Sequence, residues 1–485
     1  MKKKQEGYIT LYLTLTLGIM LTLIFLLLEA VRNETIRTET ECVMDISLYS
    51  VFGEYHRQLL EQYDLFFLDT TYGQGRADVK RSEERLQYYM NQNVHKESNF
   101  PIKVLDLTDI SCDNVTFECY QYAGDNGGQV LKKQIINYMK DKTGIDGIEH
   151  ILSEFEIIQK DGSLTKDISG EWEKADDDLK KLTEDKKKEL RKNENSEETE
   201  ITLDNPADYV KTVKAQGILN LVLPTRKEVS AMSIHPEYYF SHRSISHGTG
   251  ILKQEETIAD TWLEDYLFWE YLMEKCSHYN AEKEKSVLKY QIEYLLYGKE
   301  CDLENLESAV TKILHIREGI NFIYLISDAE KMQEAESLAW LVSALFLSPE
   351  IKDAVKSTIV FAWNYAESVK DVKILMDGNK LPIMKTKENW NTSLSDLLMF
   401  TSNLNRYEKN EEGVLYEDYL MFFLSQQSET ELLYRFMDLC EMDIRITPGN
   451  GYFQMDGCLS AVKAKANISS GYGNGYEISR TYGYE

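Results

Sequence analysis

Apolar residues fill one unbroken stretch near the start of the chain. Residues 8–28 contain no charged side chain, and three lysines precede them: Lys2, Lys3 and Lys4. At about 1.5 Å per residue, a helix over this stretch reaches roughly 30 Å, the thickness of the hydrocarbon core of a bilayer. The pattern predicts one transmembrane helix.

The flanks of this stretch favour an uncleaved anchor with a defined orientation. A secretory signal has a shorter apolar region of about 7–15 residues and a small-x-small cleavage site. Here the run continues into Leu28-Glu29-Ala30-Val31-Arg32, which offers no such site. Positive charge marks the cytoplasmic side of a span, and the charged residues within 29–48 are mostly acidic, five against two arginines. We expect a single-pass protein of the cell membrane, with a cytoplasmic N-terminus and an extracytoplasmic bulk.

Small and weakly polar residues recur every four positions within the predicted span, at Thr10, Thr14, Gly18 and Thr22. Such stripes let membrane helices approach closely, and threonine can hydrogen-bond across the contact. The stripe is therefore a candidate transmembrane packing face. The competing interpretation is that each threonine hydroxyl bonds its own backbone, so both remain open.

A helical spacing of apolar residues continues beyond the membrane. Tyr49, Phe52, His56, Leu59, Tyr63 and Phe66 are separated by three or four positions, and no proline occurs before Pro101. The spacing predicts one amphipathic helix that extends the span, so that a single helix covers residues 8–66. A second helix is expected over residues 78–95.

Strand-like alternation marks two other regions. Residues 102–110 and 115–120 alternate around Cys112-Asp113-Asn114, which predicts a hairpin. The C-terminal residues alternate around glycines, which predicts two or three strands that pair with those near residues 102–122. The region from Ile258 to Cys440 has helical spacing throughout. The expected fold is α+β and mostly helical, with an extracytoplasmic helical body and a small antiparallel sheet.

A change in composition divides the chain. Residues 161–208 are mostly charged, with opposite charges four positions apart around Trp172, and they suggest a linker or an insertion that includes a solvated helix. The expected segments are residues 1–28 as cytoplasmic tip and span, 29–160 as a membrane-proximal α+β lobe, 161–208 as the charged segment, 209–441 as a helical lobe and 442–485 as C-terminal strands.

Charge limits the partners of the extracytoplasmic part. The chain of 485 residues carries a net charge of −27. Nucleic-acid binding needs lysine and arginine against phosphate, so no nucleic-acid partner is expected. The same charge disfavours peripheral binding to anionic lipid. Membrane contact should therefore be confined to the span.

The seven cysteines are too few for a disulfide scaffold. Two pairs flank predicted turns and are candidates for disulfides: Cys112 with Cys119, and Cys440 with Cys458. Reduced thiols throughout are the alternative, and Cys42 is the candidate for a bridge to another chain. The cysteines and histidines lack zinc-ligand spacing, so we expect neither a metal site nor a cofactor.

Six short motifs occur in the N-terminal part of the chain: Gly7-x-Ile9-Thr10-x-Tyr12-Leu13, Leu28-Glu29-Ala30-x-Arg32, Glu54-Tyr55, Leu59-Leu60-Glu61-x-Tyr63, Leu65-Phe66-Phe67-Leu68-Asp69 and Tyr72-Gly73. They resemble motifs of a bacterial family of unknown function that looks like the TadE/TadG-type pseudopilins of tight-adherence (Tad, or Flp) pili. Motifs further along are similar to the outer region of the same family: Tyr294-Leu-Leu-Tyr-Gly298, Glu304-Asn305-Leu306, Ile316-Arg317-Glu318-Gly-Ile-Asn321, Ala362-Trp363, Glu367-Ser368 and Asp371-Val372.

The resemblance implies a minor envelope component tied to pilus assembly or secretion, with other pilin-like or envelope proteins as partners of the N-terminal helix. It also makes Gly7 a candidate processing site, because type IV pilin-like proteins are cut after a glycine. Those proteins carry glutamate five residues later, where this chain has Tyr12.

The expected function is thus non-enzymatic. The Gly-x-Ser-x-Gly, His-Glu-x-x-His and phosphate-loop motifs of common enzymes do not occur in the sequence. The alternative to a pseudopilin-like component is a membrane-tethered ectodomain that binds or senses a ligand.

Overall fold

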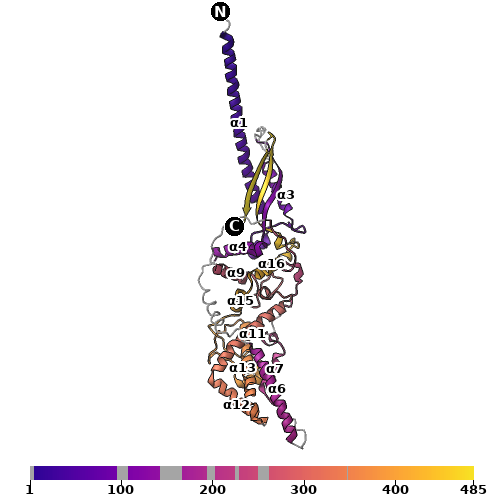
Figure 1. The fold of residues 1–485 in the computed structure, drawn as a ribbon, viewed down its shortest axis with the longest axis vertical. Helices are drawn as coiled ribbons and strands as arrows, with labels where there is room; N and C mark the ends of the chain where they lie inside the picture. The colour runs from indigo at the N-terminus through magenta and orange to yellow at the C-terminus, as the bar shows by residue number, and fades with distance from the viewer. Residues whose placement is uncertain are drawn as a thin grey trace. The chain divides into compact units, whose positions relative to one another are not determined.

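The computed structural model describes residues 5–94, 108–142, 167–193, 203–223, 229–249, 261–346, 348–473 and 475–484. The chain divides into two compact units, and each is built from separate stretches of sequence (Figure 1). Unit 1 comprises Met1–Tyr138, Glu237–Asp260 and Cys440–Glu485, and unit 2 comprises Met139–Pro236 and Thr261–Leu439.

Unit 1 begins with α1, a single helix of 48 residues over Gln5–Phe52. The prediction of one helix to residue 66 is wrong, because the chain turns after Phe52 and a short helix, α2 (Arg57–Tyr63), follows. The Nδ1 atom of His56 accepts a hydrogen bond from the backbone N–H of Leu59, at 3.2 Å, and so caps α2. His56 is therefore a helix cap and not a member of one continuous stripe.

A four-stranded antiparallel sheet forms the centre of unit 1. The central strand, β3 (Cys458–Ser470), pairs along one edge with β2 (Ile110–Tyr122). Its other edge pairs with β1 (Leu68–Asp69) and β4 (Gly475–Gly483). The predicted pairing of the C-terminal strands with the segment near residues 102–122 is confirmed for β3, whereas β4 pairs with β3 and not with β2.

The predicted hairpin turn at residues 112–114 is wrong. β2 passes through this point as one strand, and its pairing with β3 shifts from Cys112 opposite Ile468 to Asn114 opposite Asn467. The extra residue, Asp113, is accommodated as a bulge, which a strand tolerates without reversing. Residues 102–107 of the predicted hairpin lie outside the described residues.

Helices cover the sheet on its apolar face. The second half of α1 contacts α3 (Val79–Val94) and β4, and α3 contacts β2. Along β3, buried Val462, Ala464, Ala466 and Ile468 alternate with the partly exposed Lys463 and Lys465, as expected for a sheet with one covered face. The helix expected over residues 78–95 is confirmed by α3.

Unit 2 is helical in its described residues, and α13 (Lys352–Met376) lies at its centre. This helix is buried almost throughout from Val355 onward, since α6, α7, α8, α11 and α12 all pack against it. The helices of this unit are α6 (Ile168–Asn193), α7 (Pro206–Lys214), α8 (Ile218–Val222), α9 (Thr261–Lys275), α10 (Gln291–Tyr297), α11 (Asp302–Ser327), α12 (Ala329–Leu345), α13, α14 (Phe400–Asn403) and α15 (Tyr416–Ser425).

Two further helices contain a boundary between the units as defined here: α4 (Asp125–Lys142) and α16 (Glu429–Arg445). Short 3₁₀ turns complete the described elements: η2 (Pro236–Tyr238), η3 (Pro349–Ile351), η4 (Leu394–Met399) and η5 (Met455–Gly457). The single final helix expected over residues 420–440 is in fact two helices, α15 and α16, separated by a turn.

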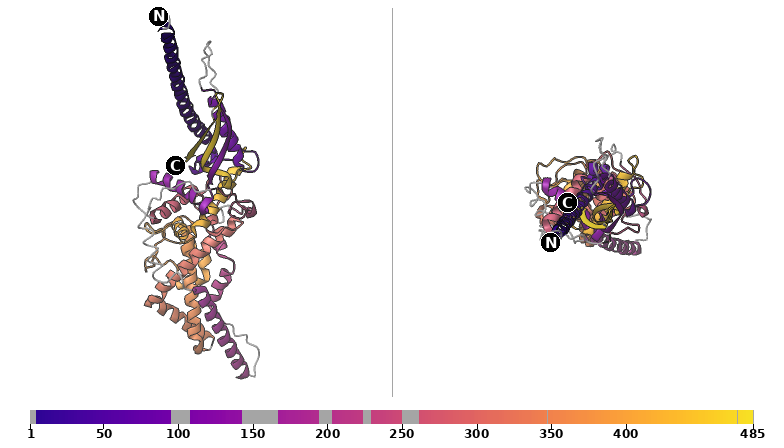
Figure 2. Two further views of the ribbon diagram at one scale, coloured as in Figure 1. Left: turned by 45° about the horizontal axis from the view of Figure 1, so that its top comes forward. Right: turned by 90° about the horizontal axis from the view of Figure 1, so that it is seen from above.

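The charged segment is not a linker where it is described. Residues 168–193 form α6, which packs against α13 and belongs to unit 2 (Figure 2). Ile168, Trp172 and Leu179 are buried on one side of α6, while the exposed side carries lysine–carboxylate pairs such as Lys180 with Asp177. Three apolar residues at helical spacing are enough to dock a helix that is otherwise charged.

Candidate interaction surface on the N-terminal helix

The first half of α1 exposes its apolar side chains. From Tyr8 to Leu28 nearly every side chain is exposed, with Tyr8 at 72% and Leu28 at 56%. The helix is long and apolar enough to cross a membrane, and its most apolar window is not buried by the rest of the chain. Figures 1 and 2 show this half of α1 extending beyond the sheet of unit 1. An apolar helix of this length fits a membrane span or a signal anchor.

The predicted packing face lies along this exposed half. The hydroxyl groups of Thr14 and Thr22 donate to the carbonyl oxygens of Thr10 and Gly18, at 3.0 and 3.1 Å. A methyl group added at Gly18 would meet nothing within 4 Å. Thr14 and Thr22 therefore present methyl groups and Gly18 presents bare backbone, since the hydroxyls of these two threonines are satisfied within the helix. Packing of another helix on the stripe stays a prediction. Gly7 lies within α1, and cleavage there also stays a prediction.

The second half of α1 has a buried inner face and an exposed outer one. The inner face packs onto the core of unit 1 through Ile36, Thr40, Val43, Met44, Ser47, Leu48 and Val51. On the opposite side lies a line of exposed, mostly apolar residues that we call the outer stripe: Val31, Thr35, Thr38, Cys42, Ile46 and Tyr49. Tyr49 was expected on the packed side, but it is 70% exposed.

Two threonines of the outer stripe also direct their hydroxyls inward. Thr35 donates to the carbonyl of Val31 at 2.8 Å, and Thr38 donates to the carbonyl of Glu34 at 3.0 Å. A shallow hollow along this side is lined by Val31, Glu34, Thr35, Thr38, Glu39 and Cys42. The surface is thus apolar along its centre and acidic at its margins.

Two basic side chains near the outer stripe contact other residues of unit 1. Arg480 of β4 contacts the carboxylates of Glu41 at 3.0 Å and Asp45 at 3.2 Å. The Arg32 guanidinium lies 4.1 Å from the ring centre of Tyr472, a cation–π contact. Sequence reasoning missed this surface, although its signal was present as alternating steps of four and three from Val31 to Cys42.

The two predicted disulfide pairs have different outcomes. Cys112 and Cys119 stand seven residues apart on the single strand β2, which is far beyond the Cα separation of about 4.4–6.8 Å that a disulfide needs. That pairing is wrong. Cys440 and Cys458 are both buried, and burial raises the pKa of the Cys458 thiol, with nearby carboxylates and Cys440 adding to the effect. Their pairing stays a prediction.

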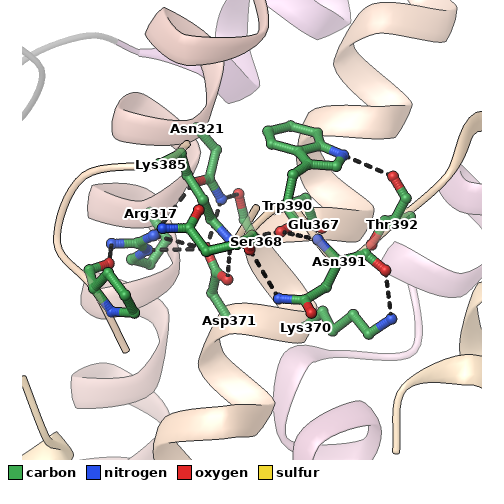
Figure 3. A network of polar contacts seen from close by, with 12 residues as sticks. Arg317, Asn321, Glu367, Ser368, Lys370, Asp371, Lys385, Trp390, Asn391 and Thr392 are labelled. Carbon is green, nitrogen blue, oxygen red and sulfur yellow. Dashed lines mark hydrogen bonds and ion pairs between the residues drawn. The ribbon is translucent and has the colours of Figure 1, made fainter. Parts of the chain in front are cut away.

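Buried charge is concentrated in unit 2, in a network that joins α11, α13 and the loop after α13 (Figure 3). Arg317 contacts Asp371 at 2.9 Å, and both side chains are fully buried. Lys385 contacts Asp371 at 2.6 Å and Glu367 at 2.5 Å. Burial alone would raise the pKa of Asp371, but Lys385 and Arg317 hold it below its ordinary value. We call these four residues the ionic core.

The surrounding polar contacts fasten the loop to the helices. Arg317 donates to the carbonyl of Ile383 at 2.7 Å, and Lys370 donates to the carbonyl of Asn391 at 2.8 Å. Trp363 donates from its indole nitrogen to the carbonyl of Thr392, also at 2.8 Å. The ionic core thus has a structural arrangement, because its charges are matched, buried and used to hold backbone groups.

Several motifs that carried the family resemblance meet in this network. Arg317 and Asn321 come from one motif, while Glu367 and Asp371 come from two others about 50 residues later. The Asn321 amide donates to Asp371 at 2.8 Å. These motifs therefore supply side chains that hold α11 against α13. The spacing of the motifs in the sequence did not predict this contact.

Three other buried carboxyl groups have a pKa raised to about 7, with burial as the largest cause: Glu293, Glu318 and Glu441. Glu293 in unit 2 accepts hydrogen bonds at one oxygen from the N–H of Tyr279 and the hydroxyl of Tyr416, at 3.0 and 2.8 Å. Glu441 in unit 1 contacts Arg243 and Arg445. Across the described part of the chain, no group of three or more His, Cys, Asp or Glu side chains is arranged to hold a metal ion.

Comparison with known proteins places this architecture in a family. The model of a family described as "Family of unknown function (DUF5702)" matches residues 179–470, a range that contains the ionic core and the whole of β3. No curated protein matches the chain, and no solved structure matches it. Since the match covers more than half of the sequence, the chain belongs to the DUF5702 family of unknown function.

Proposed function

We propose that the protein is a membrane-anchored, non-enzymatic component of the cell envelope, of the kind that TadE/TadG-type pseudopilins represent in a pilus or secretion assembly. One observation carries the proposal. α1 is a continuous helix of 48 residues that is apolar and exposed in its first half and packed on an antiparallel sheet in its second. A lipid-spanning rod is thereby joined rigidly to a folded body.

Physical chemistry favours a bilayer around the first half of α1. Removing one leucine or isoleucine side chain from water is worth about 1.5–3 kcal/mol, and this half exposes more than a dozen large apolar side chains. Lys2, Lys3 and Lys4 at its start favour a cytoplasmic N-terminus by the positive-inside rule. Unit 2 and the part of unit 1 that follows residue 28 then lie outside the cytoplasm.

The packing face supports a role in assembly. Thr10, Thr14, Gly18 and Thr22 present a line of small groups along the span, and close approach of helices in lipid depends on such residues. The proposed partners are other single-span, pilin-like or envelope proteins that lie alongside α1.

Crosslinking in native membranes tests the proposal. A photoreactive residue at position 14 should capture the transmembrane helix of another envelope protein, whereas the same residue at position 23, on the opposite side of α1, should capture mainly lipid. Equal capture of protein from both positions, or lipid alone from both, would contradict the packing face. Extraction of the whole protein by alkaline carbonate would contradict the anchor itself.

A further inference from the structure

The sheet of unit 1 has two outer edges, and side chains cover the edge formed by β2. The Glu83 carboxylate accepts a hydrogen bond from the backbone N–H of Phe117 at 2.7 Å, and the Thr249 hydroxyl accepts one from the N–H of Tyr120 at 3.1 Å. The backbone N–H of Thr249 donates in turn to the carbonyl of Tyr120, also at 3.1 Å. Because these outward groups already have partners, β2 is closed to a further strand.

The opposite edge, formed by β4, is open among the described residues. The backbone N–H of Tyr484 donates to the carbonyl of Ser460 in β3, at 3.0 Å. Since backbone groups alternate in direction along a strand, the even-numbered residues of β4 face β3 and the odd-numbered residues face outward. Within the part of the chain that the structure describes, the outward N–H and C=O groups of Glu477, Ser479 and Thr481 have no hydrogen-bond partner.

β4 also lacks the features that usually protect an exposed edge, which are a short strand, a bulge, proline or outward lysine. It has nine residues without proline or lysine, and its pairing with β3 runs without a bulge. Its two charged side chains are engaged within unit 1, Glu477 with Lys465 at 2.8 Å and Arg480 with Glu41 at 3.0 Å. The edge is therefore regular, long enough for a partner strand and free of a built-in block.

We propose that the outer edge of β4 binds an extended segment of a second envelope protein, which adds to the sheet as an antiparallel strand. In this mode of recognition, backbone hydrogen bonds hold the added strand and its alternate side chains determine which partner fits. The inference rests on the proposed function, which places β4 outside the cytoplasm among other envelope proteins. It adds to that function a second contact surface, separate from the span, and the conformation of the partner.

The two sides of β4 define the pattern of side chains that the added strand should have. On one side, Glu477, Ser479 and Thr481 are exposed, so polar residues are expected next to them. On the side covered by α1, Phe66 is 41% exposed and its ring lies 6.1 Å from that of Tyr484, just beyond the end of β4. This aromatic surface favours apolar residues, and the partner segment should therefore alternate between polar and apolar positions.

The direction of α1 disfavours a second copy of this chain as the occupant. Asn33 contacts Tyr476 at 3.3 Å, and the ring of Phe52 lies 5.0 Å from that of Tyr482, so α1 and β4 run in the same direction. A two-fold pair of β4 strands is antiparallel, because in a parallel pair the residues that face the partner stand opposite residues that face away. The two copies of α1 would then point in opposite directions and could not enter one membrane from the same side.

Photocrosslinking of the full-length protein in native membranes tests the site. Glu477 and Thr481 are replaced by a photoreactive residue in separate chains, and the crosslinked residues are located by mass spectrometry. We expect both positions to capture one segment of a second envelope protein, at two residues four positions apart. The residue captured from position 481 should precede the residue captured from position 477, since an antiparallel strand requires this order. The reverse order, or two unrelated segments, would overturn the proposal.

A proline in place of Ser479 provides a second, independent readout. The lost N–H points outward, so the bonds between β4 and β3 remain, but an incoming strand loses a hydrogen-bond donor. Ser479→Pro should lower capture from position 481 at least about tenfold, whereas the control Ser479→Thr keeps the N–H and should change it less than about twofold. Thermal unfolding checks each purified variant, and Glu477→Pro repeats the test if Ser479→Pro does not fold. Equal capture with and without the proline would overturn the proposal.

Carbonate extraction of the same membranes separates this inference from the proposed function. A chain that resists extraction but captures only lipid, or no protein, from positions 477 and 481 would overturn the strand site alone. The ordered pair of crosslinks in a chain that carbonate extracts would support the strand site and contradict the anchor. A crosslinked peptide from this chain itself, whether from β4 or from another segment, would overturn the proposal that a different protein occupies the edge.

Discussion

At the scale of single residues, the contacts of buried polar groups are the feature that the sequence predicts least well. Glu293 accepts two hydrogen bonds from residues 14 positions before it and 123 positions after it, and Asp371 is matched by both Arg317 and Lys385. In a chain with 81 acidic residues, composition gives no reason to single out these carboxylates. Their roles depend on burial, which arises only when distant segments pack.

Replacement of Glu293 by glutamine should alter how stability depends on pH. Burial raises the pKa of Glu293 from 4.5 to about 7 in the folded protein, so the folded state binds more protons than the unfolded state between these values. The stability that Glu293 contributes is therefore fully present below about pH 4.5 and is lost as the pH rises through about 7. Glu293→Gln should flatten this fall and increase the free energy of unfolding at pH 8 by on the order of 2 kcal/mol.

Chemical denaturation at pH 5, 6, 7 and 8 measures this effect. Glu411→Gln changes an exposed carboxyl group in the same unit and should leave the pH profile as in the unmodified protein. A loss of stability at pH 8 in Glu293→Gln would show that the ionised carboxylate, and not the neutral acid, is the form that the fold favours.

Removal of one partner from the ionic core should be severe. Arg317→Met leaves Asp371 with a buried charge that has lost its contacts to the Arg317 guanidinium, and an uncompensated buried charge of this kind costs about 3–5 kcal/mol. Lys387→Met breaks an exposed pair with Glu330, in which both side chains are about two-thirds exposed, and should cost less than about 1 kcal/mol. Similar urea midpoints for the two variants would refute the assignment of a structural role to the ionic core.

At the scale of elements, the hydrophobic pattern identified most helices and the sheet, but it misplaced where they end. α1 stops at Phe52 because the backbone turns at Gly53 and His56 caps the next helix, although the spacing of apolar residues continues. Likewise β2 absorbs Asp113 as a bulge, where the sequence suggested a turn. Periodicity reports which residues face a core, whereas local hydrogen bonds decide where a helix or strand begins and ends.

The end of α1 packs against β4 and the residue that follows it. We therefore expect a change at the end of α1 to lower the stability of β4. The Phe52 ring lies 5.0 Å from that of Tyr482 and 5.1 Å from that of Tyr484, and the Tyr484 hydroxyl donates to the Phe52 carbonyl at 2.7 Å. Phe52→Ala should lower the free energy of unfolding of unit 1 by about 3–5 kcal/mol, since it removes a buried aromatic side chain.

Tyr49→Ala is the matched control, because it removes an exposed aromatic residue of the same helix only three positions earlier. It should change the stability of purified protein by less than about 0.5 kcal/mol. Hydrogen exchange of β4 amides gives a local readout, and unchanged protection in Phe52→Ala would contradict the link between α1 and β4.

At the scale of the whole molecule, the sequence indicated an apolar rod with an acidic, mostly helical body, and the helical content and the small sheet are confirmed. The division of the body was harder to predict. Unit 1 combines the first residues of the chain with the last, while α6 belongs to unit 2. Changes in composition along the sequence predict units that are continuous in sequence. Unit 1 is discontinuous, because β2 from the first part of the chain pairs with β3 from the last part.

Deletion of residues 1–28 should abolish membrane association. The remaining chain keeps its strongly negative charge, so it should neither sediment with anionic vesicles nor resist carbonate extraction, whereas the full chain should do both after synthesis in the presence of vesicles. Replacing Lys2, Lys3 and Lys4 by glutamine is the control: this variant should stay anchored but insert with mixed orientation. Retention of the deleted chain on vesicles would reveal a second membrane contact in the body.

The closure of unit 1 by β3 and β4 has a consequence for biogenesis. About 400 residues separate the end of α1 from the start of β3, and a ribosome needs on the order of 20–80 s to add them. Throughout that interval the nascent helix has no sheet to cover its inner face, so Val43, Met44 and Leu48 are available to chaperones or to premature aggregation. A nonsense mutation that removes only β4 would therefore leave the earliest-made element of the protein without its final cover.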